Sequence, residues 1–191
     1  EVVTGSESAS ISSPDSLYRR TINPYTSYFV GRIKKEYNKA NTILGGMVTS
    51  SNKFIQDSYL REQLYTSSYT GGMDFIHYMK NKTYYVESKI VFSNINGSED
   101  ALLKLEMENV HRFQRPDAEH LFLDTSLTRM TGTGGSFGFG KKSGSNWRFD
   151  LSTSWLSPGL DLNDMGYIRL SDVINQGSSL SYVSIVPKGI F

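Results

Sequence analysis

The sequence predicts an all-β protein of antiparallel up-and-down hairpins, which form part of a transmembrane β-barrel of the outer-membrane type with long loops at one end. Three observations support this prediction. Apolar and polar residues alternate in hairpin-sized segments, short turns alternate with long polar connections, and pairs of aromatic residues recur at one spacing. Helical periodicity is restricted to a turn or two around Asp57 to Leu64.

The first predicted hairpin covers residues 26–49. In its first strand Phe29, Gly31 and Ile33 alternate with polar residues, as expected where successive side chains point to opposite faces of a sheet. Polar residues 38–41 provide the turn, and the paired glycines Gly45 and Gly46 obscure which face of the return strand is apolar.

The same pattern predicts two more hairpins, at residues 72–92 and 133–155, and a further strand at 178–186. The clearest alternation runs from Trp147 to Trp155, where Phe149, Leu151 and Thr153 alternate with charged residues and serines. A repeated hairpin is stronger evidence than a single alternating segment, so we expect one antiparallel sheet.

The connections differ in length at the two ends of the predicted hairpins. Turns within hairpins are short, whereas residues 50–70, 94–130 and 156–177 form long polar connections. Outer-membrane barrels have short periplasmic turns and long outer loops, while loops of this length are uncommon in compact soluble domains. We expect residues 1–24 to be an irregular lead-in and residues 25–191 to be a partial barrel, because six or seven strands are too few to close one.

Aromatic residues mark both ends of the apolar face in three strands. Each pair is separated by eight residues, which at about 3.3 Å per residue is roughly 26 Å along a strand and roughly 20 Å of height in a tilted barrel. That height is close to the apolar band of an outer-membrane barrel. A soluble β-sandwich remains the alternative, because aromatic residues are common in any strand. The pairs are Phe29 and Tyr37, Tyr84 and Phe92, and Trp147 and Trp155.

Charge and composition exclude several classes of protein. Lys and Arg number 20 against 19 Asp and Glu, so the strong positive charge of a dedicated nucleic-acid binder is absent. The sequence has no cysteine, which excludes disulfides, thiolate metal sites and cysteine nucleophiles.

The glycine-rich segment Gly135 to Lys142 has Lys142 where a phosphate-binding loop needs Ser or Thr, so we expect no cofactor.

One cluster of side chains could carry chemistry. His111, Asp117, Glu119 and His120 lie with Arg115 in the longest predicted loop, and two imidazoles and two carboxylates suit acid–base catalysis. His111 and His120 are the candidate metal ligands. The alternative interpretation is structural, with arginine–carboxylate pairs holding a long loop in place. Since no HExxH or EF-hand spacing is present, we expect no metal site and no catalytic activity in this segment.

Five segments of the sequence carry a family resemblance: Tyr28–Arg32, Thr42–Met47, Gly71–Phe75, His111–His120, and Ser157–Leu160 with Asn163–Tyr167. Together, over about Tyr28 to Tyr182, they resemble the DUF5916 family of Bacteroidetes-type bacteria. That resemblance implies an N-terminal family 9 carbohydrate-binding module followed by a long outer-membrane β-barrel region, of which this chain would be an internal part. The module is absent from these residues, so no sugar-binding position can be assigned.

We therefore expect a segment of an outer-membrane β-barrel that contacts the lipid bilayer and anchors the protein, with solute passage or a glycan-related surface role as extensions of that function. Carbohydrate would be bound only through the absent module, and no nucleic-acid partner is expected. Two alternatives stay open. One is a surface-associated hydrolase that uses the 111–120 loop, and the other is a soluble β-sandwich binding module.

Overall fold

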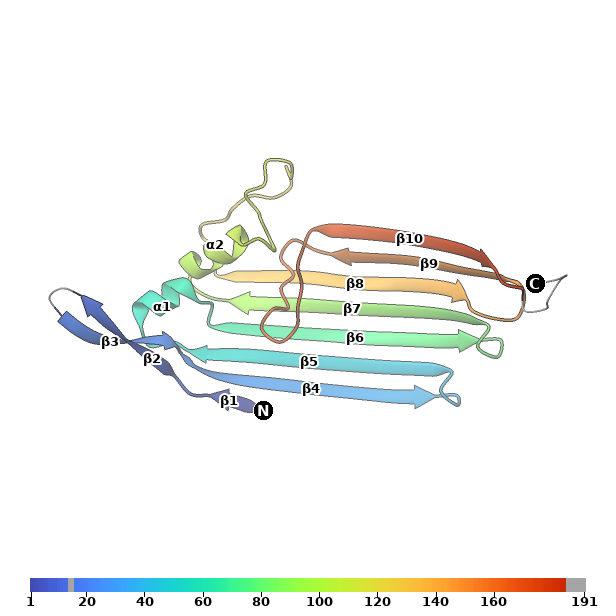
Figure 1. The fold of residues 1–191 in the computed structure, drawn as a ribbon, viewed down its shortest axis with the longest axis horizontal. Helices are drawn as coiled ribbons and strands as arrows, with labels where there is room; N and C mark the ends of the chain where they lie inside the picture. Colours follow the sequence, from blue (N-terminus) through green and yellow to red (C-terminus); the bar gives the residue numbers. More distant parts are fainter. Residues whose placement is uncertain (14–15, 185–191) are drawn as a thin grey trace, which may run out of the picture.

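A computed structural model describes residues 1–13 and 16–184 as an antiparallel eight-stranded sheet with a small two-stranded sheet beside it (Figure 1). The order in the large sheet is β1-β4-β5-β6-β7-β8-β9-β10, and β2 pairs with β3. The strands of the large sheet are β1 (Val2–Thr4), β4 (Tyr25–Tyr37), β5 (Thr42–Phe54), β6 (Ser67–Met79), β7 (Tyr84–Asn96), β8 (Arg129–Lys141), β9 (Trp147–Leu156) and β10 (Val173–Tyr182).

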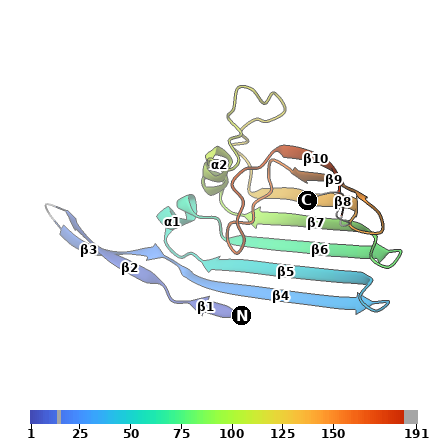
Figure 2. The same ribbon diagram turned by 45° about the vertical axis from the view of Figure 1, so that its right-hand side comes forward.

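The three predicted hairpins are confirmed as β4–β5, β6–β7 and β8–β9. Their short turns lie at one end of the sheet and the long connections at the other, which we call the turn end and the loop end (Figure 1). Each hairpin extends further toward the loop end than predicted, because polar residues such as Ser67 and Asn96 remain in the ladder. The second view shows the same arrangement, with β2 and β3 projecting beyond the loop end (Figure 2).

Three expectations about individual elements need correction. Residues 1–24, expected to be irregular, contain β1, β2 (Glu7–Ser13) and β3 (Ser16–Asn23). The last strand begins at Val173 and ends at Tyr182, and residues 185 and 186 lie outside the described part of the chain. The third correction is a helix, α2 (Glu99–Met107), within a connection where none was expected.

Both helices have the capping residues that their sequences provide. The Ser98 hydroxyl caps α2 by accepting from the amide of Ala101, and Asp57 caps the expected helix α1 (Ser58–Gln63). Only one side of α2 is apolar, and the helix is only nine residues long. The helical repeat of apolar residues is therefore too short to identify this helix from the sequence. Neither described helix is long and apolar enough to cross a membrane.

The main core is small and lies at the loop end. Leu102 and Leu105 of α2 pack against Ile95 of β7 and Met130 of β8, and all four side chains are buried. Burial of each such side chain contributes about 1.5–3 kcal/mol. This core fixes the long connections onto one face of the sheet and leaves most of the strand length outside it.

Candidate functional site

The large sheet has one continuous apolar face. The observed pairing brings one residue from each of seven strands into a single row across it, and no residue in this row is charged. Ile33, Met73 and Ile174 are each about three-quarters exposed, so nothing in the described structure covers them. The row is Ile33, Gly46, Met73, Ile90, Gly135, Trp155 and Ile174.

The three predicted aromatic pairs all lie on this apolar face. Members near the loop end pack their rings over glycines: Phe92 covers Gly71, where an added methyl group would lie 2.7 Å from the ring, and Trp155 covers Gly135 in the same way. At the turn end Trp147 contacts Tyr182 at a ring-centroid distance of 5.3 Å. Aromatic side chains therefore border the apolar face at both ends.

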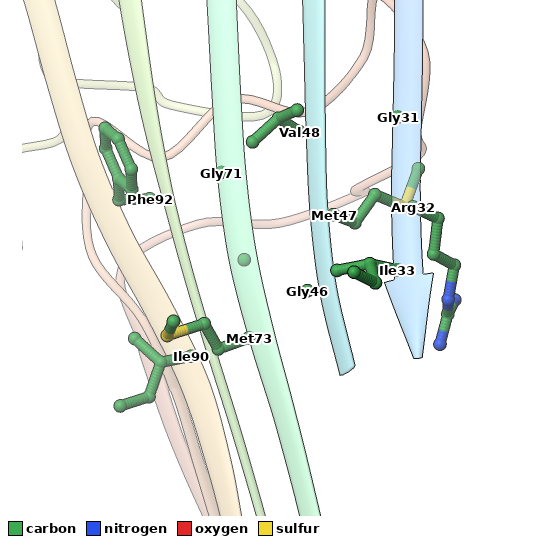
Figure 3. A pocket seen from close by; sticks show the side chains of 11 residues that line it. Gly31, Arg32, Ile33, Gly46, Met47, Val48, Gly71, Met73, Ile90 and Phe92 are labelled. Atoms are coloured by element: carbon green, nitrogen blue, oxygen red, sulfur yellow. The ribbon is translucent and has the colours of Figure 1, made fainter. Parts of the chain in front are cut away.

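A shallow hollow of about 620 Å³ lies on the apolar face between β4 and β7 (Figure 3). Its floor consists of Gly31, Gly46 and Gly71, whose missing side chains leave space between Met73 and Phe92. Apart from Arg32 its lining residues are uncharged, so the hollow offers no carboxylate or imidazole for acid–base chemistry or metal binding.

The opposite face, called the polar face, carries most of the charged residues of the strands, whereas Lys35, Arg129 and Lys141 lie on the apolar side near strand ends. Arg32 forms an ion pair with Asp74 at 3.3 Å between β4 and β6, and Tyr85 donates a hydrogen bond to Asp150 between β7 and β9. Positive and negative side chains are interspersed, which gives this face little net charge. The register confirms that the residues predicted to share it do so: Arg32, Lys34, Glu36, Glu87, Lys89, Arg148 and Asp150.

His111 lies at the junction of the two longest connections. Its Nδ1 is 2.8 Å from the carbonyl oxygen of Pro158 and its Nε2 is 3.2 Å from the Asp161 carboxylate. The histidine side chain is fully buried and that of Asp161 is 5% exposed. Both ring nitrogens therefore lie within hydrogen-bonding distance of oxygen atoms, which fixes the orientation of the ring.

Ser171 completes this junction without forming an accessible catalytic group. Its hydroxyl is 3.4 Å from Nδ1 of His111 but donates to the carbonyl of Val110 at 3.0 Å. Ser171 is also buried. A nucleophile needs a hydroxyl that is open to substrate and hydrogen-bonded to a free acceptor nitrogen on its base. The geometry of this junction instead joins the 97–128 connection to the 157–172 connection.

In the described part of the chain, the other candidate residues of the 111–120 loop share no hydrogen bond or ion pair with His111, and the ion pairs they form are with other partners. Asp117 is 80% exposed at its side chain, Glu119 is exposed, and His120 contacts Asp172 at 3.1 Å. Arg115 also binds Asp172. Within residues 1–13 and 16–184, no three His, Asp or Glu side chains are arranged to hold a metal ion.

Charge and burial set the protonation of several carboxylates here. Burial alone would raise the pKa of Asp172, but hydrogen bonds from His120 and Arg115 and their positive charges outweigh it and lower that pKa. Burial raises the pKa of Glu106 on α2, whose carboxylate accepts from the amide of Asp124 at 3.1 Å. Burial also raises the pKa of Glu108, with the charge of Asp161 acting in the same direction.

Sequence reasoning missed the partners that define these contacts. Asp161 and Asp172 lie 50 and 52 residues from the histidines they bind, and Lys53 lies 111 residues from its partner Asp164. No spacing motif connects such positions. One feature of the sequence could have indicated that these connections meet. Two segments of the family resemblance, 111–120 and 157–160, both lie in long connections, and in the structure these segments are in contact.

Comparison with known proteins gives one match. A family model described as "Domain of unknown function (DUF5916)" matches residues 2–191, a wider range than the segments that carried the resemblance. No curated protein and no solved structure matches the chain.

Proposed function

We propose that this chain, which belongs to the DUF5916 family, forms part of the wall of a transmembrane β-barrel in the outer membrane. This barrel wall would anchor the protein in the membrane. In this proposal the apolar face contacts lipid and the polar face lines the interior. Long connections lie on the outer side of the membrane and short turns on the periplasmic side, as is usual for such barrels.

The observation that carries this proposal is the uncharged row across seven strands, from Ile33 to Ile174. Soluble sheets bury such a face against a second layer, because exposed apolar surface costs about 25 cal/mol per Å². The described residues place no second layer there, and the small β2–β3 sheet projects away from the loop end (Figures 1 and 2). A lipid bilayer would supply the missing apolar contact.

Strand length agrees with a membrane span. Four central strands, β5 to β8, each contain 13 residues, which is roughly 43 Å at about 3.3 Å per residue. A tilt of about 40° leaves roughly 33 Å of height, enough for the apolar band of about 25 Å and both aromatic borders.

The sheet has two unpaired edges in the described structure. β1 pairs only with Thr26 to Tyr28, so most of β4 has an open edge, and the outer edge of β10 is also open. Unpaired backbone N–H and C=O groups are too costly within a bilayer. The proposal therefore requires further strands to complete the wall.

Spin labelling on neighbouring residues of β9 tests the proposal directly. Leu151 lies on the apolar face and Ser152 on the polar face, and the sequence has no cysteine to interfere. We would label Leu151→Cys and Ser152→Cys in the full protein, recovered from the outer-membrane fraction. We would then compare collisions with oxygen, which is enriched in bilayers, with collisions with a water-soluble nickel chelate.

A lipid-facing Leu151 position would collide strongly with oxygen and weakly with nickel, while Ser152, as the matched control, would show more nickel contact. If the Leu151 label were shielded from both reagents, the apolar face would lie in a protein core, and the β-sandwich would replace the barrel. Recovery in the soluble fraction without detergent would also overturn the proposal.

A further inference from the structure

The connection between β9 and β10 crosses the polar face at the loop end, over β8, β7 and β6 toward β5 (Figures 1 and 2). We call residues 157–166 the strap. Three of its residues contact β8, β7 and β5 in that order as the chain advances, and each contact involves a side chain or backbone position on the polar face.

Leu160 contacts β8. It is fully buried against Gly132 and Gly134, and a methyl group at Gly134 would lie 2.7 Å from a Leu160 methyl carbon. Glycine at both positions therefore lets the strap lie directly on the backbone of β8.

Asp161 contacts β7. Its amide donates a hydrogen bond of 3.0 Å to the hydroxyl of Ser93, which is fully buried. Its carboxylate binds His111, so this residue also links the strap to the 97–128 connection.

Asp164 contacts β5. Its carboxylate forms an ion pair with Lys53 at 3.3 Å, and both side chains are 13% exposed. The Lys53 ammonium also lies 3.4 Å from the centroid of the Tyr65 ring. Losing one partner of a pair this buried leaves an uncompensated charge, so removal of the Asp164 carboxylate should release this contact between the strap and β5.

We propose that the strap narrows the interior of the barrel at its loop end and restricts the passage of ions and solutes. This inference rests on the proposed barrel, in which the polar face lines the interior. The path from β9 to β5 crosses four strand spacings of about 4.8 Å, or roughly 19 Å of wall. At the loop end the strap therefore spans about half the width of the eight-stranded sheet.

Single-channel conductance of the full protein in planar bilayers tests this inference. Asp164→Ala removes the contact with β5, and we expect conductance to rise by about twofold or more as the interior widens. The double variant Lys53→Ala with Asp164→Ala removes both charges and both long side chains, so it loosens the same contact without a buried unpaired charge and decides the question if the single variant fails to fold. Asp117→Ala, on an exposed loop position, is the matched control and should leave conductance unchanged.

Heat-modifiable migration on gels separates the two proposals. If folded, membrane-inserted protein shows the same conductance in wild type and in both loosened variants, the strap does not restrict passage and the barrel proposal stands. If no variant, wild type included, enters the membrane fraction or shifts on heating, the barrel and the strap's role in it are both overturned.

Discussion

Trp155 lies over Gly135 of the neighbouring strand, directly across the ladder between β9 and β8. The indole occupies the space that a side chain at position 135 would need. A Cβ atom at this position would also lie too close to the backbone of β7. Glycine is thus required here for lack of space, and Trp155 covers the gap that it leaves in the apolar face.

Gly135→Val should displace the indole and destabilise the protein by about 1–3 kcal/mol, the usual cost of overpacking. Denaturant titration in detergent, followed by tryptophan fluorescence, measures this cost. Gly5→Ala is the control, because nothing lies within 4 Å of a methyl group at that position. Equal stability of the two variants would show that Trp155 does not occupy the position described.

Ala40 lies in the first hairpin turn with a φ of 60°, in the left-handed region. That conformation costs a residue with a side chain about 1–2 kcal/mol, while glycine adopts it freely. Ala40→Gly should therefore stabilise the protein by about 1 kcal/mol, read as a higher denaturation midpoint. Ala9→Gly, in strand β2, is the opposite control and should give no stabilisation.

Local sequence pattern predicted the sheet well because strand periodicity is itself local. Alternation assigned Ile33 and Leu151 to the apolar face, and the observed register agrees. It failed at the strand ends near the loops, where Ser68 and Ser93 are buried although serine usually marks solvent or a turn. Ser93 is buried by the strap, a segment more than 60 residues away, which no local pattern reveals.

The candidate site was only partly predictable for the same reason. His111 was identified by its chemistry, but its partner Asp161 depends on how two long connections fold over the sheet. Gly45 and Gly46 show that sequence pattern also failed to assign neighbouring residues to the two faces of the sheet. Both looked alike in sequence, yet Gly46 belongs to the apolar row and Gly45 lies beneath the carboxylate of Asp74 on the polar face.

Acid should loosen the contact between the 111–120 loop and Asp172. The pKa of Asp172 is lower in the folded protein than in the unfolded chain, so its contribution to stability is present above the unfolded pKa and is lost as pH falls through the folded pKa. The hydrogen-exchange protection factors of residues 112–120, which are corrected for the intrinsic pH dependence of exchange, should therefore fall at acidic pH. In Asp172→Asn these protection factors should already be lower at neutral pH and should change little on acidification.

Glu106 should give the opposite pH dependence. Its pKa is raised by burial, so folding favours the protonated form, and stability falls as pH rises from the unfolded pKa to the folded pKa. Glu106→Gln keeps an acceptor for the Asp124 amide and removes the buried charge. We expect this variant to be more stable than wild type at neutral pH and no more stable at the acidic limit, whereas exposed Glu62→Gln should change little at either pH.

His111→Ala should destabilise the protein by about 2–4 kcal/mol, because it opens a cavity and leaves the buried Asp161 carboxylate without its partner. Asp117→Ala should change stability by less than about 0.5 kcal/mol, since that side chain is largely in solvent. Unfolding in detergent measures the stability of both variants.

If His111 has a structural role at the junction, His111→Ala should be much less stable than Asp117→Ala. Loss of His111 should then also accelerate hydrogen exchange in residues 157–166. The surface-hydrolase alternative instead predicts two variants with intact folds and a loss of turnover in each. Wild-type stability and unchanged strap exchange in His111→Ala would contradict the structural role assigned to this histidine.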